Sequence, residues 1–272
     1  MKLAGVIGWP ARHSLSPILH GHWLRQYGIK GSVVPLRVKL EDFGRVVDAL
    51  PRMGFRGVSV TTPHKEAAFA LSAALDDDAR ATGAVNMLVF DGGTIHGFNT
   101  DVRGFEASIA ESFGVEAIRT GPALVLGAGG AAKAVAFALA RGGAPEIRVL
   151  NRTRARAETL ASVAPVKVFE WTDPKAMTGV HLLVNATSLG MQGVPPLDLK
   201  LDALPQDALV ADIVYAPLET PLLRAAKAHG NRTLDGLGML MHQAVPAFAA
   251  WFGVTPSVTS ALRAELEAAL HG

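Results

Sequence analysis

The sequence predicts an α/β protein with two domains, the second of them a doubly wound, Rossmann-type nucleotide-binding domain. Three observations carry this prediction. Short apolar runs alternate with helical patterns along most of the chain, which is typical of the α/β class. A glycine-rich turn, Gly127–Ala132, stands between an apolar run and a helical pattern. The length of 272 residues, 49% of them hydrophobic and 18% charged, fits one large domain or two small ones.

The first hundred residues predict an α/β unit of their own. Leu3–Gly8 is predicted as a buried strand. Ser16-Pro17 opens a predicted helix that runs to about Tyr27, because serine caps helices and proline fits the first turn. The apolar spacing within Leu40–Leu50 predicts another helix. The remaining elements are strands at Ser32–Val38 and Gly57–Val60, a helix at His64–Leu75, and strands at Val85–Phe90 and Thr94–Phe98 joined by a hairpin turn at 91–93.

A helix over about Val102–Phe113 leads to Gly121-Pro122, a predicted boundary. Six candidate strands then suit a doubly wound sheet, with a helix at Lys133–Ala140 after the first of them. These strands are Ala123–Leu126, Ile147–Leu150, Val166–Phe169, His181–Asn185, Leu209–Ile213 and Arg232–Leu234. The chain ends in two predicted helices, about Met239–Trp251 and Pro256–Leu270, which we expect to pack on the first domain. We therefore assign residues 1–102 plus 239–272 to a substrate-binding, catalytic domain and 103–238 to the nucleotide-binding domain.

Composition excludes several classes of function. The net charge is only +2, and no basic run or basic stripe interleaved with aromatics occurs, so a nucleic-acid partner is not expected. The absence of cysteine excludes disulfides, thiolate catalysis and cysteine-based zinc sites. No apolar stretch approaches the roughly 20 residues of a membrane helix, so we expect a cytoplasmic protein. His13, His20 and His22 lie close in sequence without acidic or cysteine partners, and no metal is predicted.

The glycine turn predicts a pyrophosphate-binding pocket. Glycines let the backbone approach the phosphates, and the helix that follows points its N-terminal N–H groups at them. The third glycine of the usual pattern is Ala132 here, an allowed variant. The NAD-binding form of this unit has an acidic residue about 20 residues further on. This chain has arginines at 152, 154 and 156 instead, and because arginine forks match phosphate, the sequence predicts NADP rather than NAD.

Polar stretches in the first domain fall at strand ends or helix starts, where α/β folds place ligands. Ser14 and Ser16 predict a carboxylate site, although Ser16 alone would serve as a helix cap. Lys65 begins a helix, where the helix dipole disfavours a cation. A lysine placed against that preference is more often functional and suits proton transfer, the alternative being a solvated surface lysine.

Two further polar residues have both a functional and a structural interpretation. Asn86 enters an apolar strand, where its amide either holds a ligand hydroxyl or satisfies a turn. Asp101 either caps the helix that follows it or pairs with Lys65 and accepts a hydrogen bond from a substrate hydroxyl. The Met239-Leu240-Met241 segment is interpreted as helix core or as the lining of a nicotinamide pocket.

Taken together and in this order, these stretches resemble the shikimate dehydrogenase family over nearly the whole chain. The resemblance implies reversible, NADPH-dependent reduction of 3-dehydroshikimate to shikimate, within aromatic amino-acid biosynthesis. The motifs that carry it are Ser14–Pro17, Thr61–Lys65, Gly83–Asn86, Asn99–Asp101, the turn at Gly127, Asn151–Thr153, Asn185–Ser188, Asp212–Tyr215, Pro217, Thr220–Leu223 and Asp235–Gln243.

The resemblance also implies a role for each site residue. Lys65 gives a proton to the carbonyl oxygen as hydride arrives and takes it back in reverse, assisted by Asp101. The substrate carboxylate is assigned to Ser14 and Ser16, and its hydroxyls and ring to Thr61, Asn86, Asp101, Tyr215 and Gln243. The pyrophosphate is assigned to Gly127, Ala128, Gly129, Gly130 and Ala131, the adenosine end of the cofactor to Asn151, Arg152, Thr153 and Arg156, and the border of the nicotinamide to Ile213, Gly236 and Met239.

The chain departs from the usual family pattern at Met87, where threonine is usual, and at Thr62, where valine is usual. Neither position is expected to touch a ligand. Two other functions stay open: a broad quinate/shikimate dehydrogenase that uses NAD, and a catalytically silent NADP-binding sensor. Loss of Lys65 or Asp101 would be the expected mark of a sensor, and both residues are present. We expect a monomer or homodimer with a small-molecule substrate and without a membrane partner.

Overall fold

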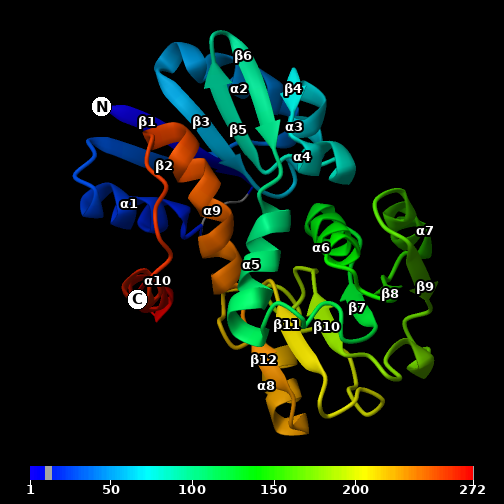
Figure 1. The fold of residues 1–272 in the computed structure, drawn as a ribbon. Coiled ribbons are helices and arrows are strands. Elements are labelled where there is room, and N and C mark those ends of the chain that lie inside the picture. The colour runs from blue at the N-terminus through cyan, green and yellow to red at the C-terminus, as the bar shows by residue number, and fades with distance from the viewer. Residues whose placement is uncertain (10–13, 272) are drawn as a thin grey trace. The chain divides into compact units, whose positions relative to one another are not determined.

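The computed structural model describes residues 1–9 and 14–271 (Figure 1). Contacts divide the chain into two compact units. The first contains residues 1–100 and the chain from Gln243 onward, and the second contains Asp101–His242. Each unit holds one six-stranded sheet with helices packed on it, so the predicted α/β class with two domains is confirmed.

The sheet of the first unit is mixed, with the strand order β2-β1-β3-β5-β6-β4. Its strands are β1 (Lys2–Gly8), β2 (Gly31–Arg37), β3 (Phe55–Val60), β4 (Ala74–Leu75), β5 (Met87–Asp91) and β6 (Thr94–Phe98). The central strand β1 pairs in parallel with β2 and β3, so the carboxyl ends of these three strands meet at one edge. The predicted hairpin is confirmed, because β5 and β6 are antiparallel neighbours.

Helices cover this first sheet, and the chain from Gln243 onward belongs to the same unit. Trp251 donates its indole N–H to the Leu88 carbonyl of β5 at 3.1 Å, and Trp23 donates to the Ser257 carbonyl at 3.1 Å. Only glycine fits at position 57, because a Cβ there would lie 2.1 Å from the Trp251 indole nitrogen. The helices are α1 (Ser16–Gln26), η1 (Leu40–Asp42), α2 (Phe43–Ala49), η2 (Pro51–Met53), α3 (Lys65–Leu71), α4 (Asp77–Thr82), α9 (Leu237–Phe252) and α10 (Ser260–His271), where η marks a 3₁₀ turn.

The segment after Lys65 differs from the prediction of one long helix. The helix α3 ends at Leu71, where Ser72 donates its hydroxyl to the Ala68 carbonyl. The next residues form β4 beside β6, an added strand pair that helical periodicity does not reveal. The helix α4 is a further element that was not predicted, although Asp76 caps its start by accepting from Ala79 N–H at 2.8 Å and a left-handed Gly83 ends it.

The sheet of the second unit is parallel throughout, with the order β12-β11-β10-β7-β8-β9. Numbered from its own first strand, this is the doubly wound order 3-2-1-4-5-6 read in reverse, with the switch point between β7 and β10. Its strands are β7 (Ala123–Leu126), β8 (Ile147–Leu150), β9 (Val166–Phe169), β10 (Leu182–Asn185), β11 (Leu209–Asp212) and β12 (Arg232–Leu234). Its helices are α5 (Asp101–Phe113), α6 (Gly130–Arg141), α7 (Arg154–Glu158) and α8 (Pro221–His229), with 3₁₀ turns η3 (Thr159–Ser162) and η4 (Pro174–Ala176).

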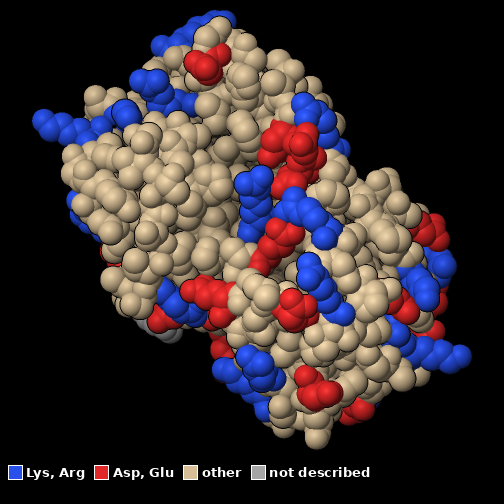
Figure 2. All heavy atoms as spheres, in the orientation of Figure 1, with Lys and Arg blue, Asp and Glu red and all other residues tan. Residues whose placement is uncertain are grey.

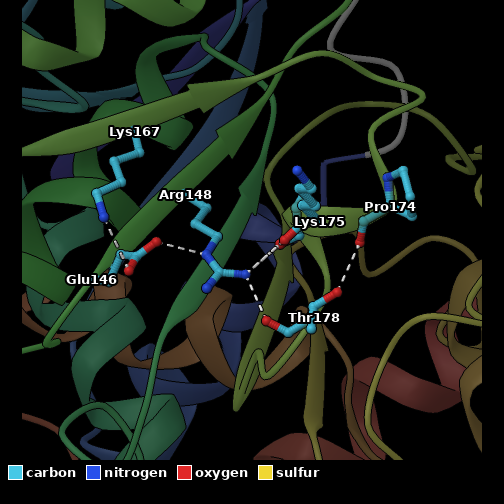
Figure 3. A network of polar contacts seen from close by, with 7 residues as sticks. Glu146, Arg148, Lys167, Pro174, Lys175 and Thr178 are labelled. Carbon is cyan, nitrogen blue, oxygen red and sulfur yellow. Dashed lines mark hydrogen bonds and ion pairs between the residues drawn. The ribbon is translucent and has the colours of Figure 1, made fainter.

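A polar network fixes the outer part of this second sheet (Figure 3). Arg148 on β8 donates through Nε to Glu146 at 2.8 Å. Its Nη1 donates to the carbonyls of Lys175 at 2.9 Å and Thr178 at 2.8 Å, in the turn that η4 opens. Lys167 on β9 lies 3.3 Å from the same glutamate. One partly buried guanidinium thus holds the connection between β9 and β10 against β8.

Charged side chains of both signs are interspersed on the face shown in Figure 2. Surface ion pairs occur between charged side chains, such as Lys227 with Glu219 at 2.7 Å. Across residues 1–9 and 14–271, no helix is both long and apolar enough to cross a bilayer.

Candidate active site

The start of α1 brings the two predicted carboxylate-binding serines together. Ser16 is the first residue of the helix and is 8% exposed. Its backbone N–H donates to the Ser14 hydroxyl at 3.3 Å. The alternative that Ser16 caps the helix is wrong, because Ser16 is the first helical residue and Leu15, whose side chain makes no capping hydrogen bond, holds the cap position. Both hydroxyls lie at the start of a helix, where the helix dipole favours an anion. His13 of the histidine cluster lies outside the described residues.

The segment from Thr61 to Lys65 runs from the end of β3 into α3. Thr61 N–H donates to the Ile7 carbonyl of β1 at 2.9 Å, and the Lys65 carbonyl accepts from Val85 N–H at 3.0 Å. Lys65 is the first residue of α3 and is half-buried. The backbone on both sides of this lysine is thus attached to the sheet.

Asn86 belongs to a closed hydrogen-bonded cluster. Its Nδ2 donates to the Thr100 hydroxyl at 2.9 Å and to Gln243 Oε1 at 2.8 Å. Its Oδ1 accepts from Thr100 N–H at 2.7 Å, and the Thr100 hydroxyl donates to the Gln243 carbonyl at 2.8 Å. Asn86 and Thr100 are 4% and 5% exposed. The amide of Asn86 therefore links distant segments rather than satisfying a local turn.

The motif Asn99–Asp101 gives Thr100 no role of its own in the sequence, yet the structure places Thr100 in this cluster. Its position between Asn99 and Asp101 was the available signal, but its partners are 14 and 143 residues away. Asn99 faces away from this cluster and donates to the Thr82 hydroxyl at 2.9 Å and the Ala84 carbonyl at 3.0 Å. Asn99 thus supports the turn that carries Asn86.

Asp101 is the first residue of α5 and is 4% exposed. A carboxylate in the first turn of a helix is stabilised by the helix dipole. The residue before it, Thr100, is fixed by the cluster just described. The backbone of Asp101 is therefore held from its N-terminal side.

The glycine turn lies between β7 and α6 at the switch point of the second sheet. Gly127 N–H donates to the Leu150 carbonyl at 2.8 Å, and its φ of 107° is a conformation that favours glycine. A Cβ at this position would lie 2.9 Å from Thr187 Cγ2 and 3.1 Å from the Ala186 carbonyl oxygen. A Cβ on Gly129 would meet nothing within 4 Å. The space over Gly129 and the N–H groups of the first turn of α6 fit a pyrophosphate.

The segment after β8 carries the arginines predicted to bind the 2′-phosphate. Asn151 closes the turn by donating to the Thr153 carbonyl at 2.7 Å. Arg154 is held in ion pairs with Glu158 at 2.9 Å and Glu170 at 2.5 Å. Arg152 and Arg156 are exposed and have no ion-pair partner within the part of the chain that the structure describes, so they are the cations of this run that fit a phosphate.

A buried polar network stands at the ends of β10 and β11, next to the glycine turn. Asn185 donates to Asp212 at 2.9 Å, and the Thr220 hydroxyl donates to the other oxygen of this carboxylate at 2.7 Å. Burial raises the pKa of the Asp212 carboxyl, and the hydrogen bonds from Val214, Thr220 and Asn185 act in the opposite direction. The network fixes the loop that begins at Ala186, against which Gly127 packs.

The residues predicted to border the nicotinamide lie in the second unit. Ile213 N–H donates to the Asn185 carbonyl at 3.0 Å, and Gly236 N–H donates to the Val214 carbonyl at 3.1 Å. Only glycine fits at position 236, because a Cβ would lie 2.2 Å from the Ile213 carbonyl oxygen. Met239 is 8% exposed within the apolar core, and Tyr215 is half-buried.

The described residues contain no group of three or more histidine, aspartate or glutamate side chains that could hold a metal ion. The fold and these residues define a two-unit α/β protein whose second sheet has the dinucleotide-binding topology. Comparison with known proteins identifies its family. The family model for the shikimate dehydrogenase substrate binding domain matches residues 6–88, and the model for shikimate / quinate 5-dehydrogenase matches residues 109–189. The chain belongs to the shikimate dehydrogenase family, as the sequence predicted.

Individual relatives agree with this assignment. A shikimate dehydrogenase (NADP(+)) of Paramagnetospirillum magneticum is 54% identical over 267 residues, 97% of each chain. The structure of shikimate 5-dehydrogenase from Thermus thermophilus, in complex with NADP(H) and shikimate, is 38% identical with a TM-score of 0.87, covering 100% of this chain and 99% of that one. A quinate dehydrogenase from Corynebacterium glutamicum, in complex with NAD, is 32% identical with a TM-score of 0.89, covering 98% and 99%.

Proposed function

We propose that this chain catalyses the reversible reduction of 3-dehydroshikimate to shikimate with NADPH, a step on the route to chorismate and the aromatic amino acids. The observation that carries the proposal is the 54% identity with an NADP-dependent shikimate dehydrogenase over 97% of both chains. The cluster of Asn86, Thr100 and Gln243 supports it, because it gathers polar groups suited to a small polyhydroxylated acid.

The cofactor supplies the hydride when it is bound. Gly127, Ala128, Gly129, Gly130 and Ala131 hold its pyrophosphate, a role that the open space over Gly129 supports. Asn151, Arg152, Thr153 and Arg156 hold the adenosine end, and the unpaired arginines supply the charge for a 2′-phosphate. Ile213, Gly236 and Met239 border the nicotinamide.

The substrate is held by hydroxyl and amide groups. Ser14 and Ser16 bind its carboxylate with their hydroxyls at the start of α1, where the helix dipole favours an anion. Gln243 uses its Oε1 to accept from Asn86, which leaves its Nε2 donors for a substrate hydroxyl. Thr61, Asn86, Asp101 and Tyr215 complete the contacts to the hydroxyls and ring.

Lys65 moves the proton. As hydride reaches the carbonyl carbon, the carbonyl oxygen gains negative charge, and the ammonium Nζ of Lys65 gives it a proton to form the alcohol. In the reverse direction the neutral amine takes the hydroxyl proton. Asp101 is its proposed partner and orients the ammonium group.

A spectrophotometric assay tests this function. We expect the purified chain to form NADPH from shikimate and NADP⁺, with a kcat/KM far above that for quinate and NAD⁺. A preference for quinate with NAD⁺ would instead establish the alternative dehydrogenase, whereas binding of NADP⁺ without turnover of either substrate would establish a sensor.

The cellular location, oligomeric state, partners and domain bounds expected for the enzyme belong to the same proposal. They are a cytoplasmic location, a monomeric or homodimeric state, no nucleic-acid partner, and domains comprising residues 1–102 plus 239–272 and 103–238. Light scattering after size-exclusion chromatography measures the oligomeric state.

A further inference from the structure

His64 stands immediately before Lys65 and is the one fully buried residue of the segment 61–64. It is 0% exposed, whereas Thr62 and Pro63 are exposed and Thr61 is half-buried. A histidine buried beside a polar site requires a physical reason, because its imidazole gives up hydration when it leaves water.

The imidazole is held on two sides. Its Nε2 lies 2.8 Å from the carbonyl oxygen of Val38, directly after β2. Its ring stacks on Phe43, the first residue of α2, with 4.9 Å between ring centroids and 9° between the planes. A carbonyl oxygen only accepts, so Nε2 carries the proton. Nδ1 is buried without a hydrogen-bond partner among residues 1–9 and 14–271, and burial lowers the pKa of His64. The ring is therefore a neutral donor.

The backbone of His64 forms the start of α3. Its N–H donates to the Thr61 carbonyl at 3.0 Å, and its carbonyl accepts from Ala68 N–H at 2.8 Å. Its φ of −90° and ψ of −6° already lie in the helical region. The side chain thus attaches the first turn of α3 to the segments at Val38 and Phe43, and the next residue in the chain is Lys65.

We infer that His64 is a positioning residue that fixes Lys65 for proton transfer. The hydrogen bond of the imidazole to Val38 and its stacking on Phe43 fix the position and direction of the first turn of α3. This inference rests on the proposed role of Lys65 as the proton donor. Proton transfer depends steeply on donor position, so small displacements of the Lys65 backbone reduce turnover more than they reduce ground-state binding.

Two substitutions separate the parts of this interaction. His64→Gln places an amide N–H at a comparable reach to the Val38 carbonyl but loses the ring. His64→Phe retains the ring on Phe43 but leaves the buried carbonyl unpaired. Because the hydrogen bond is directional, we expect kcat to fall about tenfold or more in His64→Phe and less in His64→Gln. We expect the KM values for NADP⁺ and shikimate to stay within about twofold of the wild type in both variants.

The chain offers a matched control in His20. This second fully buried histidine stacks on Phe248 at 6.0 Å and 9°, without a hydrogen-bond partner for either ring nitrogen in the described chain. We expect His20→Phe to keep the wild-type kcat and both KM values. The folded fraction of each variant, measured by circular dichroism and by titration with NADP⁺, normalises kcat.

The outcomes are distinct. A normalised kcat equal to the wild type in both His64 variants, or a loss equal to that in His20→Phe, overturns the inference. If Lys65→Ala also retains turnover, the proposed mechanism itself fails. If Lys65→Ala abolishes turnover while the His64 variants remain fully active, only the inference about His64 fails.

Discussion

In the second unit the candidate site consists mainly of backbone, whereas in the first it consists mainly of side chains. The glycine turn and the first turn of α6 follow each other within one stretch of chain between parallel strands. The cluster of the first unit joins Asn86 to Thr100, 14 residues away, and to Gln243, 157 residues away. Local geometry thus forms the predicted cofactor site, and long-range hydrogen bonds form the predicted substrate site.

This difference has a functional consequence. A backbone site needs glycine where a Cβ would collide or fill the ligand space, and it tolerates change elsewhere. A side-chain site depends on each polar group having its partner, because a buried unpaired group costs about 1–3 kcal/mol. Substitutions at the glycine turn and in the cluster of Asn86, Thr100 and Gln243 should therefore separate cofactor binding from substrate binding and turnover.

The largest effect is expected for Lys65→Ala. Removing the proton donor should lower kcat by about 10²-fold to 10⁴-fold, because general acid catalysis contributes on that order. The NADP⁺ dissociation constant, measured by fluorescence titration, should not change, because the predicted cofactor residues lie in the other unit. Near-normal turnover would show that Lys65 is not the proton donor. Loss of NADP⁺ binding would show that cofactor binding also depends on the first unit.

Each unit contains a buried group whose response to acid is opposite in sign to that of the other, His20 in the first and Asp212 in the second. Burial lowers the pKa of His20 from 6.5 to about 3, so the unfolded state binds its proton first as pH falls. Stability is therefore lost between pH 6.5 and about pH 3, by up to about 5 kcal/mol for this group. Asp212 has a raised pKa, so its folded form holds a proton more tightly and gains relative stability as pH falls through that pKa.

Hydrogen exchange at a series of pH values, resolved by peptide, measures this contrast. We expect acid to open the first unit before the second, and His20→Phe to remove most of the loss in the first unit. Equal acid sensitivity in His20→Phe and the wild type would show that the buried imidazole is not responsible.

Two glycine substitutions sharpen the description of the backbone site. Gly127→Ala forces an alanine to a φ of 107° and against Thr187, so we expect about 1–3 kcal/mol of destabilisation and at least tenfold weaker NADP⁺ binding. Gly129→Ala has an ordinary φ of −88° and open space, so its unfolding midpoint should match the wild type. Its NADP⁺ binding should still weaken. Unchanged binding in Gly129→Ala would show that the pyrophosphate does not lie over this residue.

The smallest effect is expected for Thr100→Val, which keeps the shape of the side chain and removes its hydroxyl. The Gln243 carbonyl and Asn86 each lose a partner, so stability should fall by about 1–2 kcal/mol. The KM for shikimate should rise while that for NADP⁺ stays constant. Thr100→Ser retains the hydroxyl and should restore both quantities; failure of this rescue would show that the methyl group matters instead.

Much of the fold was predictable because it is encoded locally. The six strands of the second unit are short apolar runs between turn residues, and β7, β8, β9 and β12 have the predicted bounds. The prediction failed where pairing overrides periodicity. Ala74–Leu75 continues a helical pattern but forms a strand because β6 offers an open edge. The helix α4 is short, and its cap at Asp76 lies within a run of three aspartates that obscures it.

The site was predictable to a similar degree. The glycine turn could be recognised because the order of strand, glycines and helix in the sequence predicts its binding function. Thr100 and His64 were not, since their importance depends on partners brought close only by folding. The run of arginines does not by itself separate Arg154 from its neighbours. The structure shows that Arg154 already forms ion pairs with Glu158 and Glu170.

The first unit is interrupted in sequence by the whole of the second, and this order matters during synthesis on the ribosome. The aromatic rings of Phe248 and Trp251, which cover His20 and fill the space left at Gly57, emerge only after the whole of the second unit. Until then, the apolar surface of the nascent first hundred residues stays exposed. Asp101–His242 is continuous in sequence and can complete its own sheet earlier.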